Sequence, residues 1–377
     1  MTTSYIGVND QKAVCIWSKL LNQEISKAIP IASLIGKDSN SIIQLRDEAS
    51  KANGDSISFN LRTQLYGNGI SEEDELEGNE EHLHFLSDRV VINELAHAVR
   101  VKNEGTIDQQ RVIHDLRTEA KNALVDWYTD RLSMMFFMHV CGYTPDALEF
   151  EGRNLQLSPV HYGFNKPTAP TSKRIIRPND KMADEELDKN DVFDLQLIDK
   201  AVERAKLANP KIRPVRVDGE NVYVLYLHPT QVTQLRTNTD RGQWLDITKA
   251  GYNGSRGKNP IFDGSLGMYN GVILREAEHI TQGVVSSTED EVPESMPSTR
   301  RAVLLGAQSA VIAFGKDRGS TRYKLVEGLF DYEREFGVAA RTIIGMKKTR
   351  FDFSDMVDEG EVQDFGTIVI TTYAEPV

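Results

Sequence analysis

The chain has 377 residues, of which 40% are hydrophobic and 27% are charged, a composition typical of a soluble globular protein with two or three domains. Acidic residues outnumber basic ones by 56 to 44, and the net charge of −12 argues against a surface built for tight phosphate binding. No apolar run reaches the roughly 18 residues of a membrane span, and the N-terminus lacks the basic start and apolar core of a signal peptide. We therefore expect a protein that is made and kept in a cytoplasm.

Residues 1–55 are predicted to form an arm rather than a domain core. After a polar start, apolar residues follow helical spacing from Ala13 to Ile25, and Pro30 ends this element. The residues after Pro30 show no clear periodic pattern. One helix is therefore expected in this segment.

Residues 56–104 are predicted to form an extended hairpin. Apolar and polar residues alternate from Ile57 to Leu65, and a period of two returns between Val91 and Val101. Between these strands lie several glycines and the acidic segment 71–81. Because a two-stranded hairpin is marginally stable alone in water, we expect it to bind another molecule.

The stretch 106–141 is predicted to be one helix around which the rest of the chain is organised. Its length of about 36 residues corresponds to about 54 Å. A plausible capping box begins at Thr106, and Gly142 is the expected stop. Residues 132–140 are apolar nearly all round and should be buried on every side. The apolar stripe recurs every three or four residues and comprises Ile113, Leu116, Ala120, Leu124, Tyr128, Leu132 and Met135.

Residues 143–190 contain five prolines and little periodicity, and are expected to form an insertion-like loop. Helical spacing returns from Val192 to Ala208, where Pro210 follows. The nearly continuous apolar run from Asn221 to Leu227 predicts a strand buried on both faces.

Strand signals dominate the remainder of the chain. A hairpin is predicted over 268–274, and 302–314 is expected to be a small-residue helix or another buried segment. Mixed strand signals occupy 323–346. The β-branched run 366–373 predicts a terminal strand.

Few residues suggest catalysis. His139 lies two positions from Cys141, but such neighbours in a helix point apart, so core packing is favoured over a Cys–His nucleophile. Cys15 and Cys141 have neither zinc nor disulfide spacing and are interpreted as buried small hydrophobes. His82 and His84 would share a strand face and could contact a metal, but no third ligand is evident.

Two further charged patterns are weak. Glu94 and His97 have the Glu-x-x-His spacing of di-iron helices, but the motif occurs once and lies in a predicted strand. Lys347, Lys348 and Arg350 form a small basic cluster, which is expected to be a solvated face or a contact with an acidic neighbouring subunit. We predict no catalytic, cofactor-binding or metal-binding residues.

The C-terminal half carries a series of short motifs in a fixed order, which are Tyr226-Leu227-His228-Pro229, Asn259-Pro260, Gly271-Val272, Leu305-Gly306-Ala307-Gln308, Ala313-Phe314-Gly315-Lys316, Phe330-Asp331-Tyr332, Gly345-Met346-Lys347-Lys348-Thr349-Arg350-Phe351 and Asp364-Phe365-Gly366. Together they resemble the major capsid proteins of N-four-like podophages, a branch of the tailed-phage capsid family. The resemblance is carried by residues 190–377, while the first half matches mainly by layout.

The resemblance implies an α+β fold of the Hong Kong phage type. It assigns 1–55 to an N-terminal arm and 56–104 to an extended hairpin, the E-loop. A P-domain would cover 105–218, with the spine helix 106–141 and the insertion-like loop 143–190. An A-domain would follow over 219–335, and 336–377 would return to the P-domain.

The resemblance also implies the function. Pentamers and hexamers of the chain would form an icosahedral virion shell around packaged double-stranded DNA, assembled in the host bacterial cytoplasm without membrane contact. Scaffolding, portal and possibly decoration proteins would be partners, and no cofactor is expected. One alternative is an encapsulin-like compartment shell. An alternative of another class is a soluble cytoplasmic enzyme using His139 and Cys141, or His82 and His84.

Overall fold

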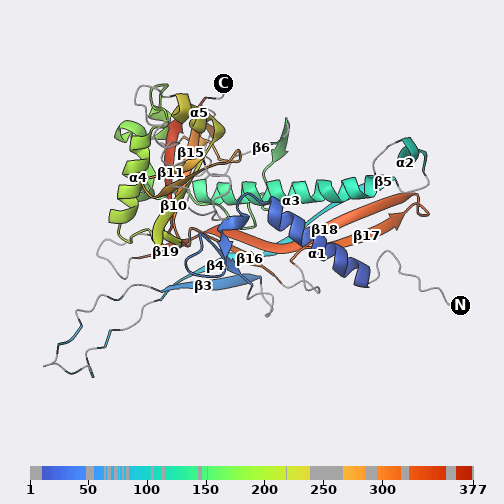
Figure 1. Cartoon of the computed structure of the whole chain (residues 1–377), viewed down its shortest axis with the longest axis horizontal. Helices are drawn as coiled ribbons and strands as arrows, with labels where there is room; N and C mark the ends of the chain where they lie inside the picture. The colour runs from blue at the N-terminus through green and yellow to red at the C-terminus, as the bar shows by residue number, and fades with distance from the viewer. Residues whose placement is uncertain are drawn as a thin grey trace.

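The structure is a computed structural model of the 377-residue chain. The part described here comprises residues 11–47, 55–62, 65, 69–71, 75, 77–78, 80–81, 85–102, 106–111, 115–142, 147–150, 152–217, 219–237, 266–285, 295–296, 298–315, 322–353 and 362–375. One long helix, α3, crosses the molecule and joins a broad end to a slender one (Figure 1). A sheet with two further helices forms the broad end, and a ribbon of long strands runs beside α3 to the slender end.

Helix α3 spans Leu116–Cys141 and is about 39 Å long. The carboxylate of Asp115 caps it by accepting a hydrogen bond from the Arg117 amide at 3.0 Å. It ends at Gly142, whose φ of 69° is left-handed, as predicted. Every residue from 132 to 140 is buried, which confirms the expectation for that end.

The predicted single helix 106–141 is wrong at its beginning. Residues Ile107–Arg111 form a separate short helix, α2. Asp115 has extended φ and ψ angles, and its side chain occupies the N-cap of α3, so the long helix cannot continue backwards through it. From Leu116 onward the predicted apolar stripe faces the core, because Ala120, Leu124 and Tyr128 are buried. Ile113 lies outside the described residues.

The first sheet lies under α3 and supplies the ribbon at the slender end. Its path is β1-β2-β16-β18-β17, and β5 pairs with β18. The strands are β1 (Ile35–Gly36), β2 (Ile43–Arg46), β16 (Ala310–Phe314), β17 (Lys324–Phe330), β18 (Glu335–Lys348) and β5 (Asn93–Lys102). Strand β18 is the longest, and its alternate residues are buried against α3 and α1.

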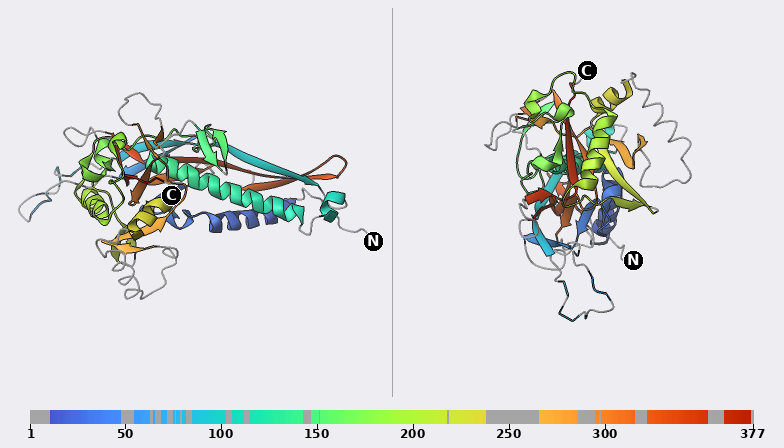
Figure 2. Two further views of the ribbon diagram at one scale, coloured as in Figure 1. Left: turned by 90° about the horizontal axis from the view of Figure 1, so that it is seen from above. Right: turned by 90° about the vertical axis from the view of Figure 1, so that its left-hand side faces the viewer.

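Helix α1, over Gln11–Ala28, lies beside α3 (Figure 2). Its Leu21 and Ile25 belong to the main core, and the Ser18 hydroxyl accepts a hydrogen bond from the Leu325 amide at 3.1 Å. The one helix predicted for residues 1–55 is therefore present, but its apolar face packs in the main hydrophobic core.

The hairpin predicted over 56–104 pairs differently from the expectation. Strand β3 (Ser56–Arg62) pairs with β4 (Phe85–Val91), whereas β5 forms an antiparallel ladder with β18. The prediction that the strand from Val91 to Val101 forms the second strand of the hairpin was therefore wrong. The β3–β4 pair packs on the open side of the first sheet through Ile57, Phe59 and Val90.

The second sheet forms the centre of the broad end. Its order is β11-β12-β10-β15-β21-β8, and β9 pairs with β10. The strands are β11 (Gly267–Tyr269), β12 (Val272–Glu276), β10 (Glu220–Leu227), β15 (Thr299–Leu305), β21 (Thr367–Tyr373), β8 (Ile175–Ile176) and β9 (Val215–Val217). The strands predicted over 221–227 and 366–373 and the hairpin predicted over 268–274 are confirmed.

Alternation along these strands divides the core in two. Val224 of β10 faces the main core with α3, whereas Leu225 faces a second core with α4 (Leu195–Leu207) and α5 (Pro229–Thr237). Both faces of the sheet are therefore covered, which explains the continuous apolar run in β10. Helix α4 confirms the helix predicted over 192–208.

Residues 302–314 are not helical. They are split between β15 and β16, which belong to different sheets. Gln308, with a φ of 58°, and neighbouring small residues make the connection. The helical alternative fails because each half of this apolar run is buried as a strand.

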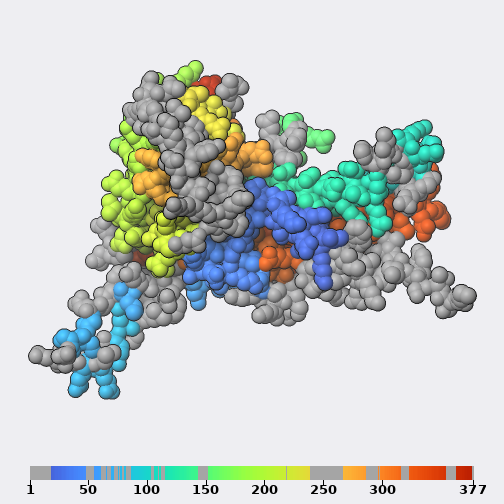
Figure 3. Space-filling view, viewed as in Figure 1, coloured from blue at the N-terminus to red at the C-terminus, as the bar shows by residue number. Residues whose placement is uncertain are grey.

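Residues 143–190 are more than a loop. Strands β6 (Ala147–Phe150) and β7 (Arg153–Gln156) form a small hairpin that stands clear of the body (Figure 3). Three 3-10 turns follow, at Ser172–Arg174, Pro178–Asp180 and Asp184–Glu186, and strand β8 pairs with β21 at the edge of the second sheet. Another 3-10 turn lies at Ala32–Leu34. The remaining strand pairs are β13 (Gly283–Val284) with β14 (Ser295–Met296) and β19 (Arg350–Asp352) with β20 (Val362–Asp364).

Candidate functional site

The His139 and Cys141 pair does not have the properties of a nucleophilic site. His139 is buried, and its Nε2 lies 2.8 Å from the Tyr162 carbonyl oxygen. Burial lowers the pKa of His139 to about 4, and nearby Lys348 adds to this effect. Burial raises the pKa of the Cys141 thiol, whose Sγ lies 3.4 Å from the Arg301 carbonyl oxygen. A thiolate–imidazolium pair requires the opposite shifts, so both residues act as core.

The other sequence candidates are separated or lie outside the described part. Glu94 is exposed, whereas His97 stacks on Trp127 with ring centroids 4.4 Å apart. His82 and His84 are outside the described residues. Among the described residues, no group of three or more His, Cys, Asp or Glu side chains could hold a metal ion. Within the same residues, no helix is sufficiently long and apolar to cross a membrane.

The basic cluster at 347–350 is paired with acidic residues of the same chain. Lys348 is 1% exposed, and its Nζ lies 3.0 Å from Oδ2 of Asp364. Arg350 approaches the same carboxylate at 3.6 Å, and Lys347 pairs with Asp88 at 2.6 Å. The expected solvated face was therefore wrong for Lys348, whereas the expected contact with an acidic neighbouring subunit stays a prediction.

A second buried ion cluster joins the 143–190 segment to the end of α3. Asp184 is fully buried and lies 2.8 Å from Nη2 of Arg301 and 2.6 Å from Nε of Arg177. Burial would raise the pKa of Asp184, but the two guanidinium groups outweigh it and hold that pKa below its usual value. Arg301 also donates from Nη1 to the carbonyl oxygens of Cys141 and Gly142, at 3.2 and 3.1 Å.

This geometry makes Asp184 and Arg301 a joint between separate parts of the fold. The positive guanidinium meets the negative end of the α3 dipole, which is a favourable arrangement. Arg301 comes from β15 and Asp184 from a 3-10 turn, so three segments are fixed at one point. Sequence reasoning missed the cluster because Arg301 and Asp184 are 117 residues apart.

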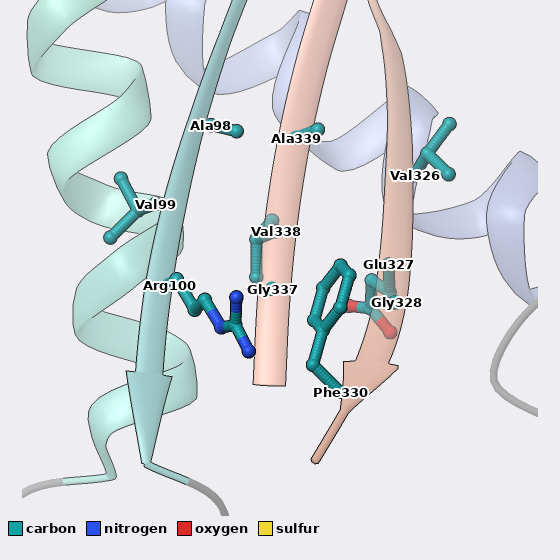
Figure 4. Close-up of a pocket in the computed structure, with 10 residues that line it drawn as sticks. All are labelled: Ala98, Val99, Arg100, Val326, Glu327, Gly328, Phe330, Gly337, Val338 and Ala339. Carbon is teal, nitrogen blue, oxygen red and sulfur yellow. The ribbon is translucent and has the colours of Figure 1, made fainter. Parts of the chain in front are cut away.

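The slender end presents a surface groove of about 270 Å³ on the face of the ribbon opposite the helices (Figure 4). Val338 and Glu327 point toward the helices, while Ala98, Ala339 and Val326 line the open side. The small side chains leave this face hollow. Farther along the sheet, Ile343 is covered by the β3–β4 pair, so the hollow lies where that cover ends.

An aromatic and a guanidinium group border the groove at the tip of the ribbon. The Phe330 ring lies over two glycines, and a Cβ added at Gly337 would meet its Cε2 at 2.7 Å. Glycine is therefore needed for this close approach. The Arg100 guanidinium lies 4.5 Å from the Phe330 ring centroid, and Arg100 also pairs with Glu335.

The β17–β18 turn that follows Phe330 has an unusual backbone. Asp331, Tyr332 and Glu333 have φ angles of 50°, 52° and 69°, all left-handed. Tyr332 is 100% exposed and Leu329 is 36% exposed. A sequence without glycine or asparagine at these positions gave no signal for such a turn.

Taken together, the described residues show buried ion clusters that stiffen the body and apolar features at its tip, and no converging catalytic groups. This is the geometry of a subunit whose surfaces matter more than a cleft. The family model described as phage capsid protein matches residues 5–376. The chain belongs to the phage capsid protein family. It is a major capsid protein of a phage, a structural protein of the virion.

Individual relatives agree over nearly the whole length. The major capsid protein of Pseudomonas phage KPP25 is 27% identical over 376 residues, which cover 96% of this chain and 94% of that protein. The solved capsid of Ralstonia phage GP4 is 30% identical, with a TM-score of 0.77 and coverage of 100% of this chain and 99% of that one. The cyanophage Pam1 capsid shares the fold at 19% identity and a TM-score of 0.62, covering 100% of this chain and 95% of that one.

These comparisons confirm the α+β fold of tailed-phage capsid proteins that the sequence predicted. They support neither the encapsulin-like compartment nor the soluble enzyme. The capsid family is structural, and a capsid subunit assembles with copies of itself. The surfaces that this chain offers to another copy are therefore its functional sites.

Proposed function

We propose that this capsid protein assembles as pentamers and hexamers into an icosahedral shell that encloses packaged double-stranded DNA. The observation that carries the proposal is the end-to-end likeness to the Ralstonia phage GP4 capsid, which leaves no large part of the chain outside the shared fold. Head-to-tail contacts close into rings when each subunit is related to the next by rotation. Such rings are the capsomers of the proposed shell.

The proposed domain roles follow the strand pairings. The helix α3, β5, β17 and β18 would form the P-domain, with α3 as its spine. The second sheet with α4 and α5 would form the A-domain at the capsomer centre. Compared with the division expected from the sequence, β16 and β17 would move from the A-domain to the P-domain, while β8, α4, β9 and β21 would move the other way.

The β3–β4 hairpin would act as the E-loop and lie over a neighbouring subunit, and the N-terminal arm would clamp another. Two observations support the hairpin's role. It forms a two-stranded sheet of its own, and the described residues Glu75, Glu77 and Glu80 beyond it are exposed. Seven carboxylates and no basic residue occupy 71–81, so a neighbouring basic surface would attract this segment.

Branch and partners complete the proposal. The ordered C-terminal motifs favour the N-four-like podophage branch and the Hong Kong type of assembly. Scaffolding, portal and possibly decoration proteins would be partners during assembly in the host bacterial cytoplasm. The net charge of −12 suits a wall that contains DNA without gripping it.

Sedimentation and electron microscopy of the expressed full chain test the proposal. Closed shells or rings with five and six subunits are expected, alone or with a scaffolding protein. A Glu-specific protease provides a second measurement, since cleavage at Glu75 to Glu80 should occur in free subunits and be suppressed in shells. A compact monomer at every concentration, with and without scaffold, would refute the proposed assembly.

A further inference from the structure

One guanidinium on the long helix has no counter-charge. Arg131 of α3 is 7% exposed, and its Nε and Nη1 are enclosed without a hydrogen-bond partner. Burial lowers the pKa of Arg131, and no described carboxylate opposes this effect. An enclosed charge without a partner is costly, so such groups in proteins are normally paired with an acid or with a bound ion. Arg131 therefore has the properties of a group that awaits an anion.

An aromatic stack holds this guanidinium in place. Arg131 lies one helical turn after Trp127, and its Cζ is 4.9 Å from the Trp127 ring centroid. The His97 ring of β5 stacks on the same indole at 4.4 Å, with the two planes 15° apart. The indole face positions the guanidinium but accepts no conventional hydrogen bond, so the N–H groups of Arg131 stay available to a ligand.

A further donor comes from the segment after β7. Nδ1 of His161 lies 3.1 Å from the Ser158 amide nitrogen and accepts its hydrogen. In a neutral imidazole the other ring nitrogen then carries the proton, so Nε2 of His161 is a donor. The next residue, Tyr162, is fixed on α3, because its carbonyl oxygen accepts a hydrogen bond from Nε2 of His139 at 2.8 Å.

The two imidazoles and the guanidinium lie close together. Burial lowers the pKa of both His97 and His161, and the charge of Arg131 lowers both further, which requires the guanidinium to lie near each ring. His97 is exposed and His161 is half-buried, so a ligand from solvent can reach them. Donors that arrive from a helix, a strand and a loop suit a tetrahedral oxyanion, whose oxygens point in several directions, better than a planar carboxylate.

We propose that Arg131, with His161 and His97 beside it, binds a phosphate group. Two sources share this chemistry, a free phosphate ion and a backbone phosphate of enclosed DNA. The first source is independent of the proposed shell, whereas the second rests on it. One such site on each subunit is compatible with the net charge of −12, since sparse contacts repeated over a wall neutralise phosphates without making the whole surface basic.

Equilibrium dialysis of the full chain against labelled inorganic phosphate, in chloride buffer of constant ionic strength, tests the site. Arg131→Met should weaken phosphate binding at least tenfold, because methionine keeps an apolar stem on Trp127 and removes the charge. Arg153→Met is the matched control, since Arg153 is an exposed arginine of β7, and it should bind as the wild type does. His161→Phe removes the second donor and should also weaken binding, which keeps the test open if Arg131→Met does not fold.

Phosphate binding that is absent from the wild type at millimolar concentrations, or equal in wild type and Arg131→Met, would overturn the proposal. Fluorescence anisotropy with a short duplex DNA then separates the two sources. Weaker DNA binding by Arg131→Met than by Arg153→Met assigns the site to the DNA backbone, whereas equal DNA binding with lost phosphate binding assigns it to the free ion. A chain that binds phosphate through Arg131 but never forms shells would refute the proposed function and leave this site standing.

Discussion

The truncation of Leu124 to alanine tests whether α3 is a packed spine. Leu124 is fully buried in the first half of this helix and belongs to the main core with α1 and the first sheet. The substitution removes three carbon atoms, which accounts for about 2.4 kcal/mol at about 0.8 kcal/mol each. An unfilled cavity adds to this loss, so we expect the free energy of unfolding to fall by about 2–5 kcal/mol.

Urea denaturation of dispersed subunits, followed by circular dichroism, measures this change. Asn122→Ala is the matched control, because Asn122 is an exposed residue of the same helix, and it should stay within about 0.5 kcal/mol. Glu119 would be a poorer control, since it lies in the first turn of α3 and its charge interacts with the helix dipole. Equal stabilities of Leu124→Ala and Asn122→Ala would refute the packed spine.

Two further predictions concern buried titratable groups. Asp184→Asn should lower the free energy of unfolding in urea by about 3–5 kcal/mol, because it leaves Arg301 without its buried counter-charge. The control Asp180→Asn changes a side chain that is 83% exposed and should alter this free energy by less than about 1 kcal/mol. Equal effects of the two substitutions would refute the role of Asp184 as a joint. The pKa of His139 falls from 6.5 to about 4 on folding, so the unfolded chain binds more protons than the folded chain between these pH values. The free energy of unfolding should therefore drop by about 3 kcal/mol as the pH falls from 6.5 to 4. His139→Gln should remove this part of the stability loss. Burial also lowers the pKa of His228 to about 4, so His228 contributes a separate loss that the variant retains. Parallel pH profiles of the unfolding free energy for variant and wild type would contradict the reasoning.

Local pattern was sufficient where one segment carries its own signal. The apolar run in β10, the β-branched run in β21 and the buried end of α3 were all predicted correctly, because burial on both sides requires continuous apolar sequence. The glycine stop at Gly142 was also predicted, since a left-handed residue commonly ends a helix. The ordered C-terminal motifs then indicated the capsid family.

Pairing between distant segments was not readable from local pattern. The sequence of β5 alternates weakly and fits a hairpin as well as a ladder with β18, and only the tertiary structure places it beside a strand more than two hundred residues away. The beginning of α3 depended on whether Asp115 continued a helix or capped one. Both outcomes satisfy local preferences, and packing of the whole chain selects between them.

The charged and strained features depended wholly on tertiary structure. Nothing in the local sequence distinguishes the ion pairs Asp184–Arg301 and Lys348–Asp364 from ordinary surface charges. They become structural pairs only on burial, because a charge removed from water requires a partner. The left-handed turn at Tyr332 follows no local preference. Apolar segments and family motifs could be recognised in the sequence because each consists of neighbouring residues. The ion clusters, the strand partners and the groove at the ribbon tip form only when folding brings distant residues together.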